Sequence, residues 1–270
     1  ESGTSDRAIR SMIEDGRLVR LREGVYVDGK MWQAQRFESR LVVRSRAWAT
    51  TTERTTITSH ASAAAHHRLP LVFTRRETID LLVPEPRRGR APGIVRRRWP
   101  ADRFGTGDVE VSTVELDGVL CTDLETTVVD VGRSERRETA IAVADAALRR
   151  VAGPDPRRPD WEAVERMRTR MLDLVATRAS FRAKAASVII AADPRADGPG
   201  ESVSRDRLAA LGADVRGLQP AMPAPGGGWF YPDFELGDDV FGEFDGDGKY
   251  VDSELLAGRT TAQVVLDEKR

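Results

Sequence analysis

The chain has 270 residues, of which 40% are hydrophobic and 31% are charged, a composition typical of globular proteins with room for two domains. No stretch approaches about 18 consecutive apolar residues, and no signal peptide is recognised, so neither a membrane span nor a membrane partner is expected. The single cysteine, Cys121, excludes an internal disulfide bond and suits a reducing cytoplasm, the expected location.

The formal net charge of −1 conceals an uneven distribution. Residues 1–100 carry 20 Arg and Lys against 11 Asp and Glu, about +9, whereas residues 101–270 carry 22 against 32, about −10. Most of the early cations are arginines, whose guanidinium groups suit phosphate and guanine contacts. The first part of the chain is therefore expected to bind an anion, with DNA as the partner.

A helix and a basic hairpin are the first elements predicted. Thr4 or Ser5 is placed to cap a helix that ends at Gly16, and two short strands around a glycine turn follow over residues 18–27. This is the second half of a winged helix-turn-helix, in which the helix enters the major groove and the wing contacts the backbone. Bases would be contacted by Arg7, Arg10 and Ser11, and phosphates by Arg17, Arg20 and Arg22. An ordinary helix and hairpin with a solvated charged face is the alternative.

Four segments, residues 5–10, 16–26, 59–71 and 122–130, resemble AbiEi-type antitoxins, the transcriptional regulators of type IV toxin-antitoxin operons. The resemblance implies operator DNA and a nucleotidyltransferase-like toxin as partners. It also implies one or two helices before the first residue, so the winged helix is expected to be N-terminally truncated.

Residues 31–152 are expected to form a mixed α/β domain. The patterns predict helices over 32–50, 57–70, 122–131 and 134–150, and strands over 78–83, 94–99, 109–116 and 119–121. His60 and His67 share a helical face, but no third ligand is evident, so packing or capping is preferred to metal binding. Cys121 lies in an apolar run, which indicates a structural thiol. A second basic cluster is either a phosphate-contacting surface or a solvated rim; its members are Arg87, Arg88, Arg90, Arg96, Arg97 and Arg98.

Residues 153–199 are interpreted as a linker followed by helices. The start of this segment is rich in Pro and Arg, and amphipathic patterns then predict helices over 160–175 and 181–192. A further helix is predicted to include Glu201.

Residues 228–252 are the most informative stretch. Aromatic and β-branched residues flank Gly237-Asp238-Asp239, which predicts a hairpin. Alternation puts Glu243 and Asp245 on one face, and a turn near Asp238 puts Asp233 opposite Glu243. Three converging carboxylates indicate a site for Mg²⁺, Mn²⁺ or Ca²⁺. The alternative is that the acidic residues of this stretch only form turns.

The Pro232-Asp233 pair, the 243–246 segment and Lys249-Tyr250 resemble the core of the PD-(D/E)xK nuclease superfamily, in particular its Vsr-like members. The resemblance implies that Asp233 and Glu243 hold Mg²⁺ and that a helical Glu, matched by Glu201, assists. The lysine of this superfamily is expected at position 245, where this chain has Asp, so Lys249 is the candidate replacement. One more strand and helix are expected, so the domain is predicted to be C-terminally truncated.

The fold class predicted is α+β or α/β, in four parts. These are a partial winged helix-turn-helix (1–30), an AbiEi-like α/β body (31–152), the linker and helices (153–199) and a restriction-endonuclease-like domain (200–270). The function predicted is that of a DNA-binding protein with a Mg²⁺- or Mn²⁺-dependent endonuclease domain. Its catalytic residues would be Glu201, Asp233, Glu243, Asp245 and Lys249, with Asp233, Glu243 and Asp245 as metal ligands. The alternative is a non-catalytic regulator or antitoxin whose inactive nuclease fold serves for homodimer formation or for binding a partner.

Overall fold

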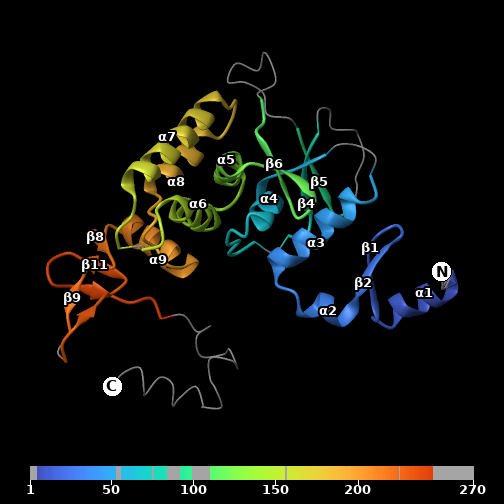
Figure 1. Ribbon diagram of the computed structural model, residues 1–270, viewed down its shortest axis with the longest axis horizontal. Helices are drawn as coiled ribbons and strands as arrows, with labels where there is room; N and C mark the ends of the chain where they lie inside the picture. The colour runs from blue at the N-terminus through green and yellow to red at the C-terminus, as the bar shows by residue number, and fades with distance from the viewer. Residues whose placement is uncertain are drawn as a thin grey trace. The chain divides into compact units, whose positions relative to one another are not determined.

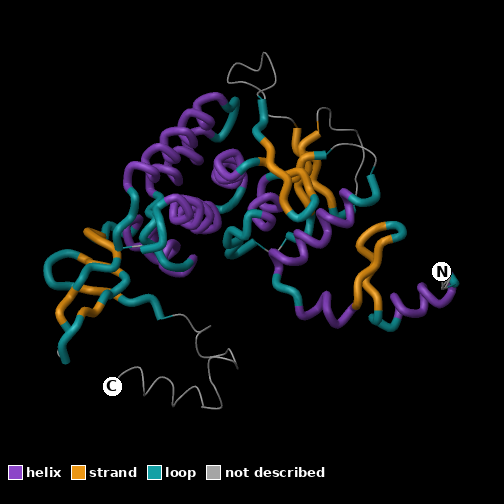
Figure 2. Tube along the Cα trace, in the orientation of Figure 1, coloured by secondary structure: helices purple, strands orange, loops and turns teal. Residues whose placement is uncertain are grey.

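The computed structural model of the protein describes residues 5–52, 56–74, 76–83, 92–98, 110–155, 157–224 and 226–245 (Figure 1). The chain divides into two compact units, Glu1–Asp206 and Arg207–Arg270. Helices and strands are both present, so the mixed α and β composition is confirmed (Figure 2). The positions predicted at Thr4, Arg87, Arg88, Arg90 and Lys249 lie outside the described residues, as does any element after residue 245.

The first unit begins with a helix and a two-stranded hairpin. Helix α1 (Asp6–Glu14) starts at Ser5, whose Oγ accepts a hydrogen bond of 3.3 Å from the backbone N–H of Ala8, as N-cap serines do. Strands β1 (Leu18–Arg22) and β2 (Val25–Asp28) pair antiparallel. The predicted cap at Ser5 and the predicted hairpin are therefore confirmed.

The helical pattern over residues 32–50 forms two helices rather than one, α2 (Gly29–Ala34) and α3 (Phe37–Ala49). The break falls at Gln35 and Arg36, which both have extended backbone conformations. Neither residue is a glycine or proline, so the local sequence carries no strong signal for the break.

Glu77 ties α3 to the segment that leads into the sheet. Its two carboxylate oxygens accept hydrogen bonds of 2.7 Å from Arg40 and 3.0 Å from Arg44. Burial alone would raise the pKa of Glu77, but these two arginines outweigh it and hold the pKa below its usual value. Two of the early arginines are therefore engaged within the protein.

Gly29 allows a close approach of two backbone segments. A Cβ added at this position would lie 1.9 Å from the carbonyl oxygen of Gly16, a distance that no real Cβ contact shows. The backbone N–H of Gly29 donates a 2.8 Å hydrogen bond to the carbonyl of Arg17. The turn after α1 and the first residue of α2 are thus in direct backbone contact.

A five-stranded mixed sheet follows, in the order β5-β4-β3-β7-β6. Its strands are β3 (Ile57–Thr58), β4 (Ile79–Val83), β5 (Ile94–Arg98), β6 (Thr113–Leu116) and β7 (Val119–Thr122). The β3–β7 and β4–β5 pairs are parallel, and the β3–β4 and β6–β7 pairs are antiparallel. Strands β4 to β7 match the predicted segments apart from their ends, whereas residues 57 and 58 were expected to be helical.

Helix α4 (His60–His66) lies between the sheet and the larger helices, and all of its residues are buried (Figure 1). It contacts the helices α3 and α5 and the strands β4 and β7. Four of its seven residues are alanine, so neighbouring elements can approach its backbone closely. Its first residue, His60, has a φ of 53°, which is unusual for a residue other than glycine.

Five helices complete the first unit: α5 (Leu124–Ser134), α6 (Arg137–Val151), α7 (Trp161–Thr177), α8 (Arg182–Ala191) and α9 (Pro199–Ala210), the last of which extends past residue 206. Asp123 caps α5, and its Oδ1 accepts a 2.8 Å hydrogen bond from the N–H of Thr126. Residues from 153–199, such as Val164 and Ile189, share one hydrophobic core with Leu41 and Ile141 of the body. The segment interpreted as linker and helices is therefore packed into the first unit.

Two buried carboxylates connect α6 with α9. Asp145 accepts hydrogen bonds of 3.0 and 2.9 Å from Arg205, and Asp206 accepts 2.7 Å from Arg137. Burial raises the pKa of Asp145 to about 6, although Arg205 opposes the change. Cys121 is buried in the sheet, and burial raises the pKa of its thiol to about 12, as a structural cysteine requires.

The second unit contains two small antiparallel sheets. Strands β8 (Val215–Leu218), β11 (Phe234–Leu236) and β12 (Phe241–Gly242) form one in the order β12-β11-β8, and β9 (Met222–Pro223) pairs with β10 (Trp229–Phe230). The β11–β12 turn is the one predicted, with positive φ at Gly237 and Asp239. Gln219 comes directly after β8.

None of the helices in the described ranges is long and apolar enough to cross a membrane.

Replacing Gly29 by alanine should destabilise the first unit. Gly→Ala at a compatible helical position commonly stabilises by about 0.4–1 kcal/mol, whereas a clash with backbone costs about 1–3 kcal/mol. Because the clash here is with the oxygen of Gly16, we expect Gly29→Ala to lower the urea midpoint. Lys30→Ala, at the exposed neighbouring position, is the matched control and should be near neutral. An equal or higher midpoint for Gly29→Ala would contradict the close approach.

Candidate functional site

The β11–β12 hairpin is the candidate site that the sequence singles out. Phe234 pairs with Gly242 and Glu235 with Phe241. Continuing this register by one residue places Asp233 opposite Glu243, as predicted. Facing residues in such a pair have Cβ atoms about 5 Å apart, so these two carboxylates belong to one patch.

Asp233 is half-buried and is fixed by the strand that follows the turn. Its Oδ2 accepts a 2.7 Å hydrogen bond from the backbone N–H of Phe244, and its carbonyl accepts 3.2 Å from the N–H of Gln219. The Asp233 carboxylate is thus held beside the backbone of residues 243–245. The hydrogen bond to Phe244 uses Oδ2 and not Oδ1. Glu243 and Asp245 are exposed and have interactions of their own.

Three acidic side chains do not meet at this hairpin. Within the described ranges, no group of three or more His, Cys, Asp and Glu residues is arranged to hold a metal ion. The predicted convergence of Asp233, Glu243 and Asp245 is therefore not seen, and two facing carboxylates remain. Mg²⁺ commonly binds through one or two carboxylates and keeps several waters, so Asp233 and Glu243 have the oxygen chemistry that it needs.

The other predicted catalytic residues lie apart from this pair in the sequence. Glu201 is in the first unit, in the first turn of α9, where its Oε2 accepts a 2.8 Å hydrogen bond from the N–H of Asp197. This bond ties the Glu201 side chain to the backbone just before the helix, since Asp197 precedes the N-cap residue Gly198. Lys249 is outside the described residues, and Asp245 occupies the position of the expected lysine.

The predicted DNA contacts on α1 are solvent-exposed. Arg7, Arg10 and Ser11 are all exposed, while Ile9 and Ile13 on the same helix are half-buried. The helix therefore turns its apolar residues toward the protein and its basic residues toward solvent. Arg20 on β1 is exposed as well.

The remaining two predicted phosphate contacts have partners within the protein. Arg17 forms a 2.6 Å ion pair with Asp15, and this bond raises the pKa of Arg17. The guanidinium of Arg22 lies 3.9 Å from the centroid of the Trp48 ring, a cation–π contact that connects the hairpin to α3. Arg22 is therefore half-buried in packing, whereas Arg20 is exposed and donates a 3.4 Å hydrogen bond from its Nε to the carbonyl of Arg22.

All three histidines of the chain are buried, and each has a ring nitrogen within hydrogen-bonding distance of an oxygen atom. His60 Nδ1 lies 2.9 Å from Ser59 Oγ, His66 Nδ1 lies 3.2 Å from Asp117 Oδ2, and His67 Nε2 lies 2.8 Å from the carbonyl oxygen of Thr122. These contacts agree with the packing and capping roles that were preferred for His60 and His67.

One polar cluster was not anticipated from the sequence. Asp80 on β4 is fully buried, and its Oδ1 accepts a 2.8 Å hydrogen bond from Arg97 on β5. Asp130 on α5 is also buried, with Arg133 at 3.4 Å and His60 at 3.8 Å. The sequence did contain a signal for this cluster: Asp80 lies inside the apolar run of β4, and a buried Asp needs a charged or hydrogen-bonding partner.

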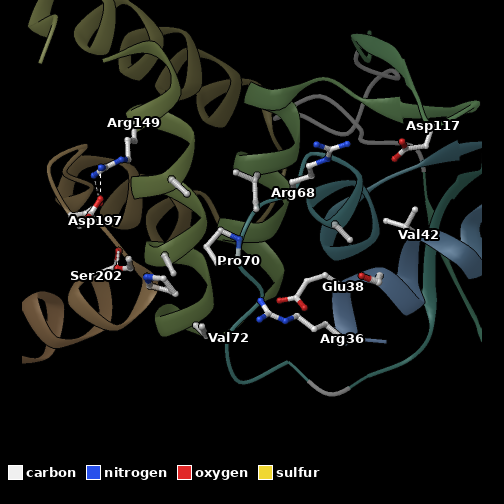
Figure 3. A pocket seen from close by; sticks show the side chains of 18 of the residues that line it. Arg36, Glu38, Val42, Arg68, Pro70, Val72, Asp117, Arg149, Asp197 and Ser202 are labelled. Carbon is white, nitrogen blue, oxygen red and sulfur yellow. Dashed lines mark hydrogen bonds and ion pairs between the residues drawn. The ribbon is translucent and has the colours of Figure 1, made fainter. Parts of the chain in front are cut away.

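One cavity of the first unit is lined by both acidic and basic side chains (Figure 3). It has a volume of about 790 Å³ and lies between α3, the segment after α4, α6 and the start of α9. Arg36, Arg68 and Arg149 are balanced by Glu38, Asp117 and Asp197 among the residues that line it. Arg149 is already paired with Asp197, as Figure 3 shows, so the charges do not converge on one ligand group.

The sequence matches no protein-family profile and no curated protein. Among solved structures, the chain is similar to the crystal structure of the RV2827C protein from Mycobacterium tuberculosis, with a TM-score of 0.34 and 15% identity over 83% of this chain and 78% of that one. This likeness is too low to assign a fold or a function.

The buried histidines predict a loss of stability in mild acid. Burial is the main cause that lowers the pKa of His60, His66 and His67 from the usual 6.5. On these histidines the unfolded chain therefore binds protons first as the pH falls, which lowers the free energy of unfolding below about pH 6.5. Asp145, whose pKa burial raises to about 6, opposes part of this loss because the folded state takes up its proton first. Imidazole NMR titration should give three pKa values below about 6.5, and the urea midpoint should fall between about pH 7.5 and 5.5. Imidazole pKa values at or above 6.5 would contradict this expectation.

Proposed function

We propose that this protein binds DNA through its basic N-terminal helix and hairpin and that its C-terminal unit is a Mg²⁺-dependent DNA endonuclease. The observation that carries the proposal is the hairpin register that sets Asp233 opposite Glu243. The exposed arginines of α1 and β1 support the DNA-binding part.

DNA recognition would use the arginines that remain exposed. Arg7 and Arg10 project from a short helix, and Arg20 lies on the adjoining hairpin, an order of elements shared with winged helices. Guanidinium groups on such a helix suit guanine edges, and those on a wing suit phosphates. The close contact between Gly16 and Gly29 supports a fixed geometry for these elements.

In the endonuclease, Asp233 and Glu243 would hold the metal ion. Bound Mg²⁺ polarises a phosphate and lowers the pKa of a coordinated water molecule. The Phe244 N–H, at 2.7 Å from Asp233 Oδ2, orients that carboxylate so that its second oxygen is available to a cation. Lys249 is proposed to stabilise the developing charge.

A non-catalytic regulator or antitoxin is the second candidate. Two observations favour it: Asp245 stands where the nuclease superfamily has its lysine, and Glu201 already accepts a hydrogen bond from the backbone of Asp197. In this case the C-terminal unit would serve in dimerisation or in binding a toxin, and DNA binding would repress transcription.

Metal-dependent cleavage of supercoiled, linear and mismatched DNA tests the enzymatic part. We expect nicking with Mg²⁺ or Mn²⁺ and its abolition in Asp233→Ala and in Glu243→Ala, with loss of Mn²⁺ binding by calorimetry in both variants. Asp239→Asn is the matched control because it removes a neighbouring acid from the turn but tolerates its positive φ. Absence of cleavage and of metal binding in the unmodified protein would leave the regulator as the function.

Salt-dependent binding to duplex DNA tests the basic face separately. Replacing Arg7, Arg10 and Arg20 by alanine should weaken binding and reduce the salt slope by about 0.9 for each phosphate that the protein ceases to neutralise. The control is the triple alanine variant at the exposed Arg158, Arg166 and Arg182, which should retain both properties. Equal effects of the two triple variants would contradict the assignment of the face.

A further inference from the structure

A second cavity in the first unit has a strongly basic lining. It has a volume of about 560 Å³ and is bounded by β4 and β5, by α5, and by the segment that leads into α8. Four cationic side chains line it, Arg97, Arg98, Arg133 and Lys184, together with one carboxylate, Asp130. Arg97 is paired with Asp80, so four cations face two carboxylates and an excess of two positive charges remains.

The cations are held in position by the protein. Arg133 donates 2.9 Å to the carbonyl of Ser180 and 3.1 Å to its hydroxyl, and Lys184 donates 2.5 Å to the carbonyl of Glu135. Neutral partners of this kind fix a side chain without cancelling its charge. Arg97 and Arg133 also form ion pairs with Asp80 and Asp130, so the excess positive charge that remains for an anion is that of Arg98 and Lys184.

Buried polar atoms at this cluster are incompletely satisfied. Asp80 is fully buried, and its Oδ2 has no hydrogen-bond partner among the described residues. Arg178 next to the cavity is also fully buried, and within the same ranges none of its three side-chain nitrogens has a partner. Buried charges without partners destabilise the folded state, and a bound ligand or ordered water would offset this cost.

The start of α8 adds a second source of positive potential. Ala179, Ser180 and Phe181 line the cavity immediately before this helix. Phe181 occupies the N-cap position in a left-handed conformation and provides no side-chain acceptor for the first N–H groups. A ten-residue helix that begins uncapped beside four cations is a suitable place for phosphate.

Asp130 and His60 indicate that the ligand is more than a bare oxyanion. Both line the cavity and both are more than nine-tenths buried. A carboxylate repels an anion but accepts hydrogen bonds from hydroxyl or amino groups. The volume of the cavity also falls within the range of about 300–1,000 Å³ that small-molecule sites have.

We propose that this cavity binds a small phosphorylated ligand of mononucleotide size, with the phosphate beside Arg97, Arg98, Arg133 and Lys184 and a hydroxyl or amino group of the ligand at Asp130. The site lies wholly within the first unit, so it does not depend on the endonuclease assigned to the hairpin.

Calorimetric titration of the full chain with AMP, ADP, pyrophosphate and adenosine tests the proposal. We expect saturable binding of AMP or ADP, weaker binding of pyrophosphate, and none of adenosine. Because a hydrogen bond to a charged group contributes about 1.5–3 kcal/mol, Arg98→Ala should weaken nucleotide binding by about tenfold or more. Arg98 is exposed, so its removal should leave folding intact.

Two further variants separate ligand binding from stability. Asp130→Asn should change the preference between AMP and pyrophosphate, whereas a purely structural Asp130 would alter the thermal midpoint without altering that preference. Arg166→Ala, at an exposed arginine on α7, is the control and should bind as the unmodified protein does.

Three results would overturn the proposal. The first is the absence of saturable binding by any of the phosphorylated compounds. The second is binding that Arg98→Ala and Arg166→Ala weaken equally, which would indicate nonspecific attraction to positive charge. The third is binding of a 5′-phosphorylated DNA oligonucleotide at Arg98 without binding of AMP or ADP, since the cavity would then take a DNA end.

Discussion

The complete burial of α4 is the constraint on which the first unit depends. A helix between a sheet and other helices must have small side chains, and each of its polar groups must find a partner because water is excluded. The alanines meet the first requirement. For the second, Ser62 Oγ accepts 2.9 Å from the N–H of Asp80, His66 contacts Asp117, and His67 contacts the carbonyl of Thr122. These contacts connect α4 and the following His67 to β4, to the β6–β7 turn and to β7, whereas His66 Nε2 has no partner among the described residues.

The positive charge of the early chain serves two purposes that a residue count cannot separate. Arg40 and Arg44 bond to Glu77, and Arg97 bonds to the buried Asp80. These arginines stabilise the body, and their charge is largely cancelled. Arg7, Arg10 and Arg20 are exposed instead. The charge excess of about +9 in residues 1–100 therefore overstates how many cations face solvent on α1 and β1.

Local signals in the sequence were sufficient where neighbouring residues decide the structure. Ser5 and Asp123 cap helices because their side chains reach N–H groups three residues away. The β11–β12 register follows from strand alternation and from a turn that needs positive φ at Gly237. The carboxylate pair Asp233 and Glu243 could be placed opposite each other for this reason, but convergence of a third acid could not be inferred from alternation alone.

Features that depend on distant residues could not be predicted in this way. The Asp80–Arg97 pair requires β4 and β5 to be parallel neighbours, and the basic cavity also needs α8 to start beside that pair. The break between α2 and α3 has no glycine or proline to mark it, and tertiary packing decides it. The helices after residue 153 follow a linker-like segment, yet they fill the same core as the body because their apolar faces match it.

The contact between Gly16 and Gly29 fixes the spacing of α1, β1 and β2 through the backbone, so this spacing does not depend on which side chains α1 carries. Backbone atoms alone set the distance from the end of α1 to the residue that follows β2. The exposed positions of α1 are therefore free to vary in sequence without moving the hairpin. Evolution could change which surface this part of the chain recognises one side chain at a time, while the frame that presents those side chains stays constant.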